Sequence, residues 1–208
     1  MHMEVQVDKK AYRFEKYCGI DRWSSYHYQL REILALAPAS VLEVGKGDGV
    51  IGHYLRENTT TSYRSLDVAA DLHPDIVGEV EHIPLMDNDV DMVAAFEVLE
   101  HLPFQRFEPA LLELSRVARK NIIISLPHFG PSIRFSMKLP FMKELKFAWK
   151  LPYHPTHVFG GEHYWEIGKK GYELYVIRAA LVKHFVVEKE FVPYENQYHH
   201  FFVLSKRS

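Results

Sequence analysis

Three glycines spaced two residues apart follow a short apolar run and constrain the fold more than any other feature of the chain. The run covers residues 41–44, and the glycines are Gly45, Gly47 and Gly49. Glycine permits positive φ in a tight turn and lets a ligand approach the backbone closely. Helical spacing follows at residues 50–57, and a helix N-terminus offers oriented N–H groups. A strand, a glycine turn and a helix in this order predict a nucleotide-type site, with a turn that binds nothing as the alternative.

The rest of the chain alternates between strand-like and helix-like segments. Strands are expected at residues 63–67, 75–78, 90–96 and 121–126, and helices at residues 24–36 and 105–118. This alternation is typical of a parallel sheet with helices on both faces. Helical spacing returns over residues 162–183. Residues 185–192 and 198–204 form two more strands separated by a short turn, which predicts an antiparallel hairpin at the end of the sheet.

Composition fits one globular domain. The chain has 208 residues, of which 47% are hydrophobic and 25% charged, and its formal net charge is -2. Because this charge argues against a general nucleic-acid binder, we expect no stable nucleic-acid partner. The single cysteine, Cys18, favours a reducing compartment, and we expect a cytoplasmic protein without a transmembrane helix. The sequence leaves the oligomeric state open.

The side chain of Glu43 distinguishes between two kinds of nucleotide site. Gly47, Gly49 and Gly52 fit the dinucleotide spacing G-x-G-x-x-G. Glu43, however, stands two residues before the first glycine, where its carboxylate would lie unfavourably close to a pyrophosphate. A carboxylate there suits a cofactor with a cationic amino group, such as S-adenosylmethionine (SAM). We therefore expect SAM as the cofactor.

Four segments in order then resemble the motifs of the class I SAM-dependent methyltransferases. Their sequences are EVGKGDG at 43–49, YRSLD at 63–67, GEVEHIPL at 78–85, and DNDVDMV with EVLEHL between 87 and 102. The chain is similar to small-molecule methyltransferases of the type 11 and type 12 domains. This resemblance implies a Rossmann-like α/β fold of three layers, α/β/α. Its sheet would be seven-stranded and mostly parallel, with an antiparallel C-terminal hairpin.

The resemblance also implies roles for the motif residues. Asp67 would accept the ribose hydroxyls through its two oxygens, and Glu43 and Glu97 would border the methionine end. Glu79 and Val80 would contact the adenine, although the family usually has aspartate and alanine there. The expected cofactor-binding residues are Glu43, Gly45, Lys46, Gly47, Asp67, Val68, Glu79, Val80 and Glu97.

We expect a single methyltransferase domain over residues 1–208. An N-terminal helical lid would span residues 1–37, and an inserted cap at 127–161 would cover the acceptor side. The expected activity is transfer of a methyl group from SAM to a small or amphiphilic acceptor, at oxygen. A metal-assisted RNA 2′-O-methyltransferase and a non-catalytic SAM-binding protein remain as alternatives. Aromatic candidates for the lid are Tyr12, Tyr17, Trp23 and Tyr26.

Two histidines are candidates for the proton transfer that such a reaction requires. In an open α/β sheet the ligand lies beyond the carboxyl ends of the strands. His101 and His128 follow the strands expected at 90–96 and 121–126, and histidine accepts protons near neutral pH. The Glu-His-Leu sequence that contains His101 is similar to that of small-molecule O-methyltransferases, whose histidine lies near the acceptor.

The same region resembles a metal site. Glu97, Glu100 and His101, with a later histidine, are similar to the metal ligands of small-RNA 2′-O-methyltransferases. Carboxylates and imidazoles can hold a divalent ion, which would polarise a hydroxyl acceptor. Because Glu-Val-Leu-Glu-His also occurs in many metal-free relatives, we expect no metal.

Residues 134–150 (RFSMKLPFMKELKFAWK) combine basic and apolar side chains. Five lysines and arginines stand there against a single acidic residue, Glu144. A basic segment with an apolar face suits peripheral contact with an anionic membrane or an amphiphilic acceptor. We favour a cap whose apolar face packs on the domain and whose lysines are solvated.

Overall fold

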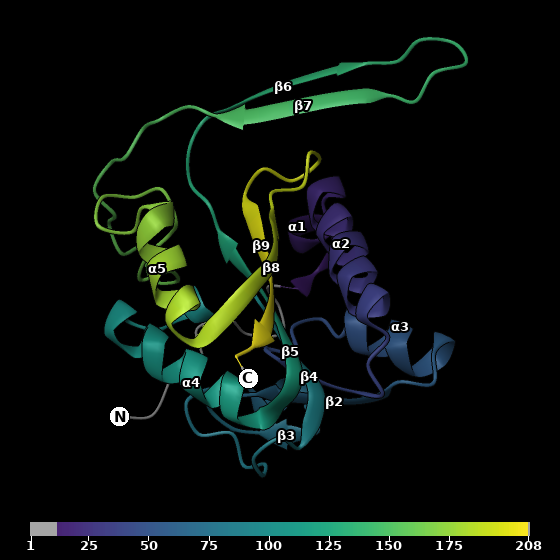
Figure 1. Ribbon diagram of the computed structural model, residues 1–208, viewed down its shortest axis with the longest axis vertical. Helices are drawn as coiled ribbons and strands as arrows, with labels where there is room; N and C mark the ends of the chain where they lie inside the picture. The colour runs from purple at the N-terminus through teal and green to yellow at the C-terminus, as the bar shows by residue number, and fades with distance from the viewer. Residues whose placement is uncertain (1–11, 208) are drawn as a thin grey trace.

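The fold is built on one central sheet. The computed structural model describes residues 12–207 (Figure 1). The sheet strands are β1 (Ser40–Val44), β2 (Ser62–Asp67), β3 (Ile76–Val77), β4 (Val90–Phe96), β5 (Ala118–Pro127), β8 (Phe185–Phe191) and β9 (His199–Lys206). Their order is β3-β2-β1-β4-β5-β9-β8. The first five run parallel, and β9 is antiparallel to both β5 and β8. This arrangement confirms the expected seven-stranded sheet with a C-terminal hairpin.

Helices cover both faces of the sheet and complete three layers. Helices α2 (Ile20–Leu36) and α3 (Val50–Asn58) lie on one side, and α4 (Phe107–Val117) and α5 (Leu174–His184) on the other (Figure 1). The shorter helices are α1 (Phe14–Tyr17), η2 (Ala70–Leu72), η3 (Leu99–His101) and η4 (Phe104–Arg106). Among the described residues, no helix combines the length and the apolarity that crossing a bilayer would require.

The buried strands explain why the sheet has two covered faces. Every residue of β4 is buried. Val93 and Ala95 pack in the core under α4 and α5, whereas Met92 and Ala94 pack in the core under α2 and α3. Because neighbouring side chains in a strand point to opposite faces, an almost continuous apolar run can occupy only a strand buried on both sides.

The helix expected over residues 162–183 is wrong in its first half. Only α5, from Leu174, is helical. Before it, Gly168 has a φ of 89°, and a Cβ there would lie 2.6 Å from the carbonyl oxygen of Phe129. The segment is instead an irregular strap, in which Trp165 and Ile167 are buried in the core. The apolar residues of the first half are spaced as in a helix because they are buried, not because the segment is helical.

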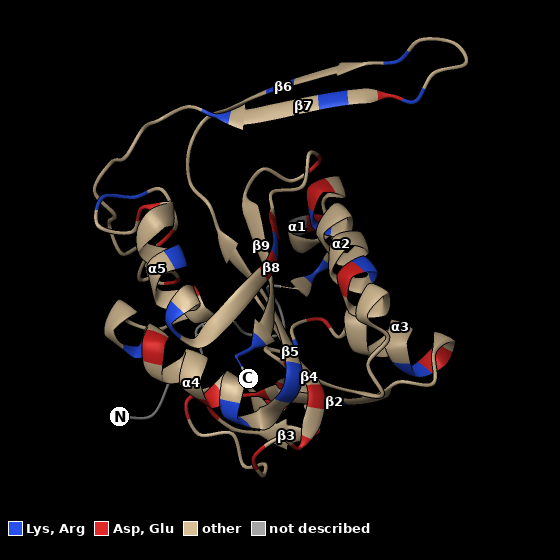
Figure 2. Ribbon diagram, viewed as in Figure 1, with Lys and Arg blue, Asp and Glu red and all other residues tan. Residues whose placement is uncertain are grey.

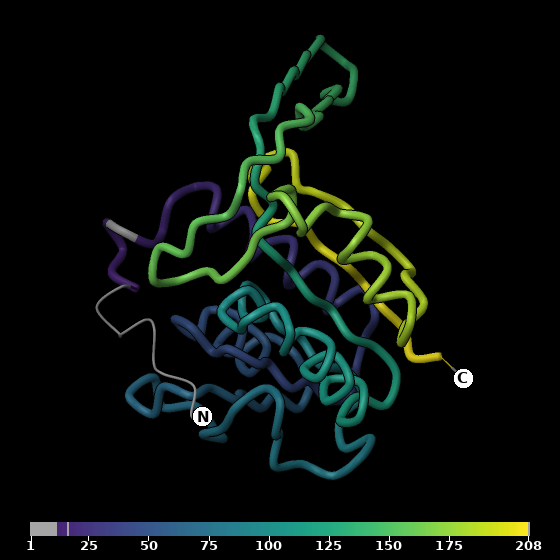
Figure 3. Tube along the Cα trace, turned by 90° about the vertical axis from the view of Figure 1, so that its left-hand side faces the viewer, coloured from purple at the N-terminus to yellow at the C-terminus, as the bar shows by residue number. Residues whose placement is uncertain are grey.

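The expected cap contains a projecting hairpin. Strands β6 (Ser132–Met137) and β7 (Leu145–Lys150) pair with each other alone, in a separate two-stranded sheet. We call residues 132–150 the arm. The arm stands away from the body of the domain (Figures 1 and 3). The expectation that its apolar face packs on the domain is wrong, because all the residues of both strands except Lys150 are exposed.

Candidate cofactor and acceptor site

The carboxyl ends of β1, β2 and β4 open onto a cavity of about 980 Å³. This volume includes the space through which the cavity opens to solvent. Of the nine expected cofactor-binding residues, all but Glu79 line the cavity, together with the catalytic candidate His101. The lining residues from the expected set are Glu43, Gly45, Lys46, Gly47, Asp67, Val68, Val80 and Glu97.

The first glycine of the loop is required by its surroundings. Gly45 has a φ of 80°, and its N–H donates to the carbonyl of Leu66 at 2.8 Å. A Cβ at this position would lie 2.3 Å from a methyl group of Val98. Positive φ and the close approach of Val98 both demand glycine here. The loop is therefore held tightly between the ends of β2 and β4.

The buried carboxyl group of Glu43 is held by a tyrosine. The hydroxyl of Tyr63 donates to Glu43 Oε2. The Tyr63 ring reaches it by passing Gly52, where a Cβ would lie 2.5 Å from the ring. Burial raises the pKa of Glu43 to about 8. A carboxyl in this state ionises when a cation approaches, which fits a ligand with an ammonium group.

Asp67 and Lys46 also line the cavity. Asp67 ends β2, and its Oδ1 accepts from the N–H of Ala69 at 2.9 Å. The Lys46 ammonium donates to the carbonyls of Leu72 at 2.8 Å and His73 at 2.6 Å. Lys46 thus ties the glycine loop to η2. These two hydrogen bonds from the Lys46 side chain hold η2 at the cavity.

Three of the four aromatic candidates for the lid lie at the cavity. Tyr12, Tyr17 and Tyr26 line the cavity, and the Tyr26 hydroxyl donates to Asp48 Oδ2 at 2.6 Å. Residues 1–11 of the lid segment lie outside the described residues. Trp23 is not among the lining residues. Arg22 does line the cavity, with its guanidinium 4.3 Å from the centre of the Tyr17 ring.

Sequence reasoning missed Arg22, although a signal was available. Arg22, Tyr26 and Gln29 occur at i, i+4 and i+7 on α2 and all line the cavity. Residues at this spacing share one face of a helix. If Tyr26 is expected to line the cofactor site, helical geometry predicts that Arg22 lines it too.

Two expected site residues lie elsewhere. Glu79 Oε2 is 3.4 Å from Arg106 Nη2, and Arg106 also pairs with Glu81. His128 Nδ1 lies 2.8 Å from Nδ1 of His200, on which its ring stacks. Burial lowers the pKa of His128 to about 3. Neither Glu79 nor His128 lines the cavity.

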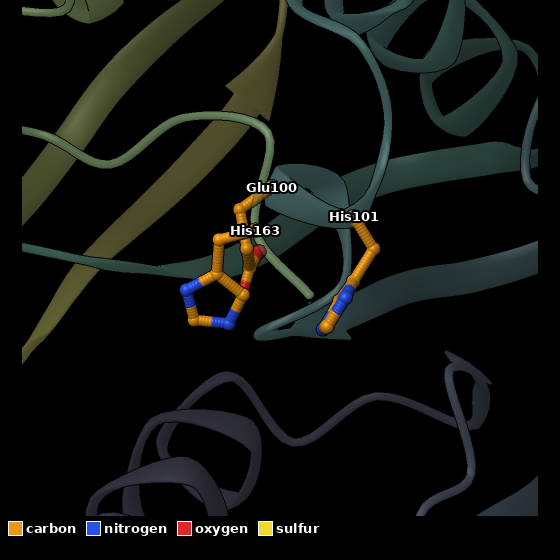
Figure 4. A group of neighbouring side chains, drawn as sticks. All are labelled: Glu100, His101 and His163. Atoms are coloured by element: carbon orange, nitrogen blue, oxygen red, sulfur yellow. The ribbon is translucent and has the colours of Figure 1, made fainter. Parts of the chain in front are cut away.

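Two carboxyl groups and two histidines meet beside the cavity. Glu100, His101 and His163 bring potential ligand atoms within 4.8 Å of one another (Figure 4). Neither oxygen of Glu100 makes a hydrogen bond within the described structure, and neither does Oε1 of Glu97. Burial raises the pKa of Glu97 to about 7 and that of Glu100 well above its usual range. Buried carboxyls without donors must be protonated or neutralised by a cation.

The histidines are oriented by neighbouring acceptors. His101 Nδ1 donates to the carbonyl of Glu162 at 3.1 Å, and His163 Nδ1 donates to Glu166 Oε1 at 3.2 Å. These bonds place the lone pair of each ring on Nε2, the form needed in a metal ligand or a proton acceptor. His163 Nε2 is 3.9 Å from Glu100 Oε1. Burial lowers the pKa of His101 to about 4, so its ring is neutral at pH 7.

Comparisons with known proteins agree with the fold and the motifs. Residues 42–125 match the family model of a methyltransferase domain. A protein from Pyrococcus horikoshii OT3 has a similar structure, with 13% identity, a TM-score of 0.61, and coverage of 97% of this chain and 100% of that one. Magnesium protoporphyrin IX methyltransferase from Synechocystis PCC 6803, solved with bound SAM, is 13% identical with a TM-score of 0.59. The match covers 97% of this chain and 87% of that one.

A third similar structure is that of the small RNA methyltransferase HEN1. The identity is 13%, the TM-score 0.63, and the match covers 100% of this chain and 27% of that one. This chain therefore spans about a quarter of that protein. A search of curated proteins gave no match. The family match identifies residues 42–125 as a methyltransferase domain, and the sheet order and the cavity lined by the motif residues agree with it. This domain contains the four sequence motifs that resemble those of SAM-dependent methyltransferases.

Proposed function

We propose that this enzyme transfers the methyl group of SAM to an oxygen atom of a small or amphiphilic acceptor. The carrying observation is that the cofactor motifs and His101 line one cavity. In the proposed reaction an acceptor oxygen forms a bond to the methyl carbon as the carbon–sulfur bond breaks. The acceptor proton passes to a base. The protein mainly aligns the two partners and accepts that proton.

Three side chains suit the polar groups of SAM. Asp67 is proposed to accept the two ribose hydroxyls, since a carboxylate offers two acceptor oxygens. Glu43 is proposed to face the ammonium group, because its buried carboxyl gains most from a nearby cation. Arg22 would then pair with the carboxylate of the methionine end, as a lining cation held over the Tyr17 ring. Val80, buried at the wall, would pack on the adenine.

His101 is proposed as the proton acceptor. Its neutral ring lines the cavity, and Glu162 fixes the tautomer with a lone pair on Nε2. His128 receives no step in this proposal because it lies outside the cavity. A small acceptor is supported by two enzymes of the same fold, which methylate magnesium protoporphyrin IX and 1,6-didemethyltoxoflavin. Because another similar structure is an N-methyltransferase, the choice of oxygen rests on His101 alone.

Calorimetric titration with SAM and S-adenosylhomocysteine tests the cofactor assignment. We expect Asp67→Ala to weaken both ligands at least 100-fold, since two hydrogen bonds to a charged group contribute roughly 3 kcal/mol or more. Asp71→Ala is a matched control on η2, because Asp71 does not line the cavity. Equal affinity in wild type and Asp67→Ala would overturn the placement of the ribose. Acceptor screening by product mass would follow.

A second candidate function is metal-assisted methylation of an RNA ribose hydroxyl. It is favoured by the three buried carboxylate oxygens without donors next to His101 and His163. Such oxygens fit a divalent cation, with Glu97, Glu100, His101 and His163 as proposed ligands. A bound ion would polarise the acceptor hydroxyl. Glu166 would then orient His163 from behind. The small net charge of -2 favours a small acceptor over RNA.

Chelation separates the two candidates. If the metal-assisted function holds, activity is lost with EDTA and restored by Mg²⁺ or Mn²⁺. Added Mn²⁺ also raises the melting temperature of the wild type but not of Glu100→Gln. His184→Ala is a control. His184, on α5, contacts Glu108 on α4 and does not line the cavity. Activity unchanged by EDTA, with no melting shift, would leave His101 as the only proton acceptor and retain the first function.

A further inference from the structure

The arm is amphipathic, and its apolar face points to solvent. Strands β6 and β7 pair in register so that three apolar cross-strand pairs share one face of the hairpin. Each of these side chains is 39–56% exposed, so the pairs contact each other across the strands while their outer surface meets solvent. The pairs are Ile133 with Trp149, Phe135 with Phe147, and Met137 with Leu145.

The opposite face of the arm is polar and is attached to the domain. Arg134 donates to the carbonyls of Tyr194 at 3.4 Å and Glu195 at 3.3 Å. Lys146 Nζ donates to Glu195 Oε1 at 2.7 Å. At the base, Lys150 donates to the carbonyl of His128. Because an isolated two-stranded hairpin is marginally stable in water, these contacts fix its orientation with the apolar face outward.

The tip of the arm continues the apolar face. Between the strands, Leu139, Phe141 and Met142 are exposed, and Phe141 is completely so. Lys138 and Lys143 flank this apex. Phe141 adopts a φ of 64°, which is uncommon for a large side chain. The apex therefore presents an aromatic ring between two lysines.

Positive charge is concentrated on the arm. Residues 134–150 hold five lysines and arginines and one glutamate. Since the whole chain has a formal net charge of -2, the remainder of the chain carries six excess negative charges. Figure 2 shows the basic positions on β7 and around the tip. The charge of this projecting part therefore favours its approach to an anionic surface.

We propose that the arm binds the surface of a membrane rich in anionic phospholipid, with its tip and apolar face among the headgroups. Exposed aromatic and aliphatic side chains next to lysines suit this interface, where apolar burial and attraction to anionic lipid act together. Trp149 would lie at headgroup level, the depth that tryptophan favours. This inference goes beyond the proposed function and does not depend on the acceptor, because binding is measured without turnover.

Flotation of the full chain with lipid vesicles tests this proposal. One set of vesicles contains phosphatidylcholine alone, and the other contains one third phosphatidylglycerol. We expect at least tenfold tighter binding to the anionic vesicles, weakened by high salt. Phe141→Ser should weaken that binding about tenfold through lost apolar burial. The double variant Lys138→Glu/Lys143→Glu should weaken it tenfold or more.

Two controls keep the result interpretable. Met86→Ser removes another exposed apolar side chain, from the loop between β3 and β4, and should bind as the wild type does. Tryptophan emission should shift to shorter wavelength on anionic vesicles, and this shift should be lost in Trp149→Phe. Failure of the wild type to float with anionic vesicles would overturn the proposal. So would a lipid-free dimer that Phe141→Ser dissociates, because a second copy would then cover the face.

Discussion

The segment around the cofactor and the segment on the acceptor side are held in place by different means. In the first, β1, β2 and β4 are mostly buried, and the glycine loop fits between them with no room for a Cβ at Gly45. In the second, residues 128–173 contain no helix, and their one hairpin meets the domain through polar contacts while its apolar face is exposed. Cofactor binding depends on backbone geometry, which tolerates little change. In the proposed function, acceptor binding would depend on a connecting segment, and such segments are where function varies on a constant fold.

The segment on the acceptor side is not loosely attached throughout. Residues 128–173 include a part that is anchored in the core. Trp165 and Ile167 are fully buried, and the N–H of Ile167 donates to the carbonyl of Pro127 at 2.9 Å. Between these residues and the arm, the chain carries His163 to Glu100. The second segment thus has its own rigid part, which completes the carboxylate–histidine cluster.

The largest expected effect is a difference between two glycines. Gly45→Ala should lower the free energy of unfolding by about 2–4 kcal/mol, because it combines a left-handed φ with a clash against Val98. Gly160→Ala should change it by less than about 0.5 kcal/mol, since a Cβ at Gly160 has nothing within 4 Å. Urea denaturation of both variants measures the difference. Equal losses would mean that the two segments are equally constrained.

Sequence reasoning predicted the first segment well for a physical reason. Strands such as β4 are buried on both faces, so their apolar runs are continuous, and the glycines are imposed by backbone geometry. Both signals are local in sequence. The prediction that Glu79 contacts the adenine depends on resemblance alone, and in the structure its carboxylate lies 3.4 Å from Arg106.

The second segment was predicted less well because its contacts are not local. Large apolar residues occupy every second position in Leu145–Lys150, and this period of two predicts a strand. Alternation does not say which face is covered. That is decided by Glu195, which lies far along the chain and attracts Lys146. Likewise, nothing in the sequence distinguished His163 from the other histidines as the neighbour of Glu100.

Two tryptophans test whether the second segment has a rigid part. Trp165 is fully buried, and its indole N–H donates to the carbonyl of Leu102 at 3.0 Å. Trp165→Phe should cost about 2–3 kcal/mol, from a cavity and an unsatisfied carbonyl. Trp149→Phe, on the exposed arm, should cost less than about 0.5 kcal/mol. Thermal unfolding at one pH measures both. A small loss at Trp165 would show that the strap is not anchored.

The next effect concerns the charge of Glu43 in the first segment. Burial raises its pKa to about 8, so the empty site holds a proton at pH 7, and the SAM ammonium should expel it. As the pH rises toward about 8, affinity for SAM should increase by up to tenfold per pH unit. At higher pH it should fall, because the ammonium group of SAM itself deprotonates.

Calorimetry at pH 7 in buffers of different ionisation enthalpy should show that a proton is released when SAM binds. Glu43→Gln should abolish the rise, and an unchanged pH profile in this variant would assign the proton to another group.

The smallest effect is expected where the arm meets the domain. Glu195 accepts from Lys146 at 2.7 Å and from the Tyr28 hydroxyl at 2.7 Å, and the Lys146 ammonium holds the pKa of Glu195 below its usual range. Exposed ion pairs contribute about 0–1 kcal/mol, so Glu195→Gln should barely change the melting temperature. The arm itself should loosen, because this pair fixes its polar face. Limited proteolysis within residues 138–144 should therefore be faster in Glu195→Gln than in the control Glu188→Gln, which alters the neighbouring β8 away from the arm. Equal cleavage rates would mean that Arg134 and Lys150 are sufficient to hold the arm, and the segment would then be more rigid than its exposure suggests.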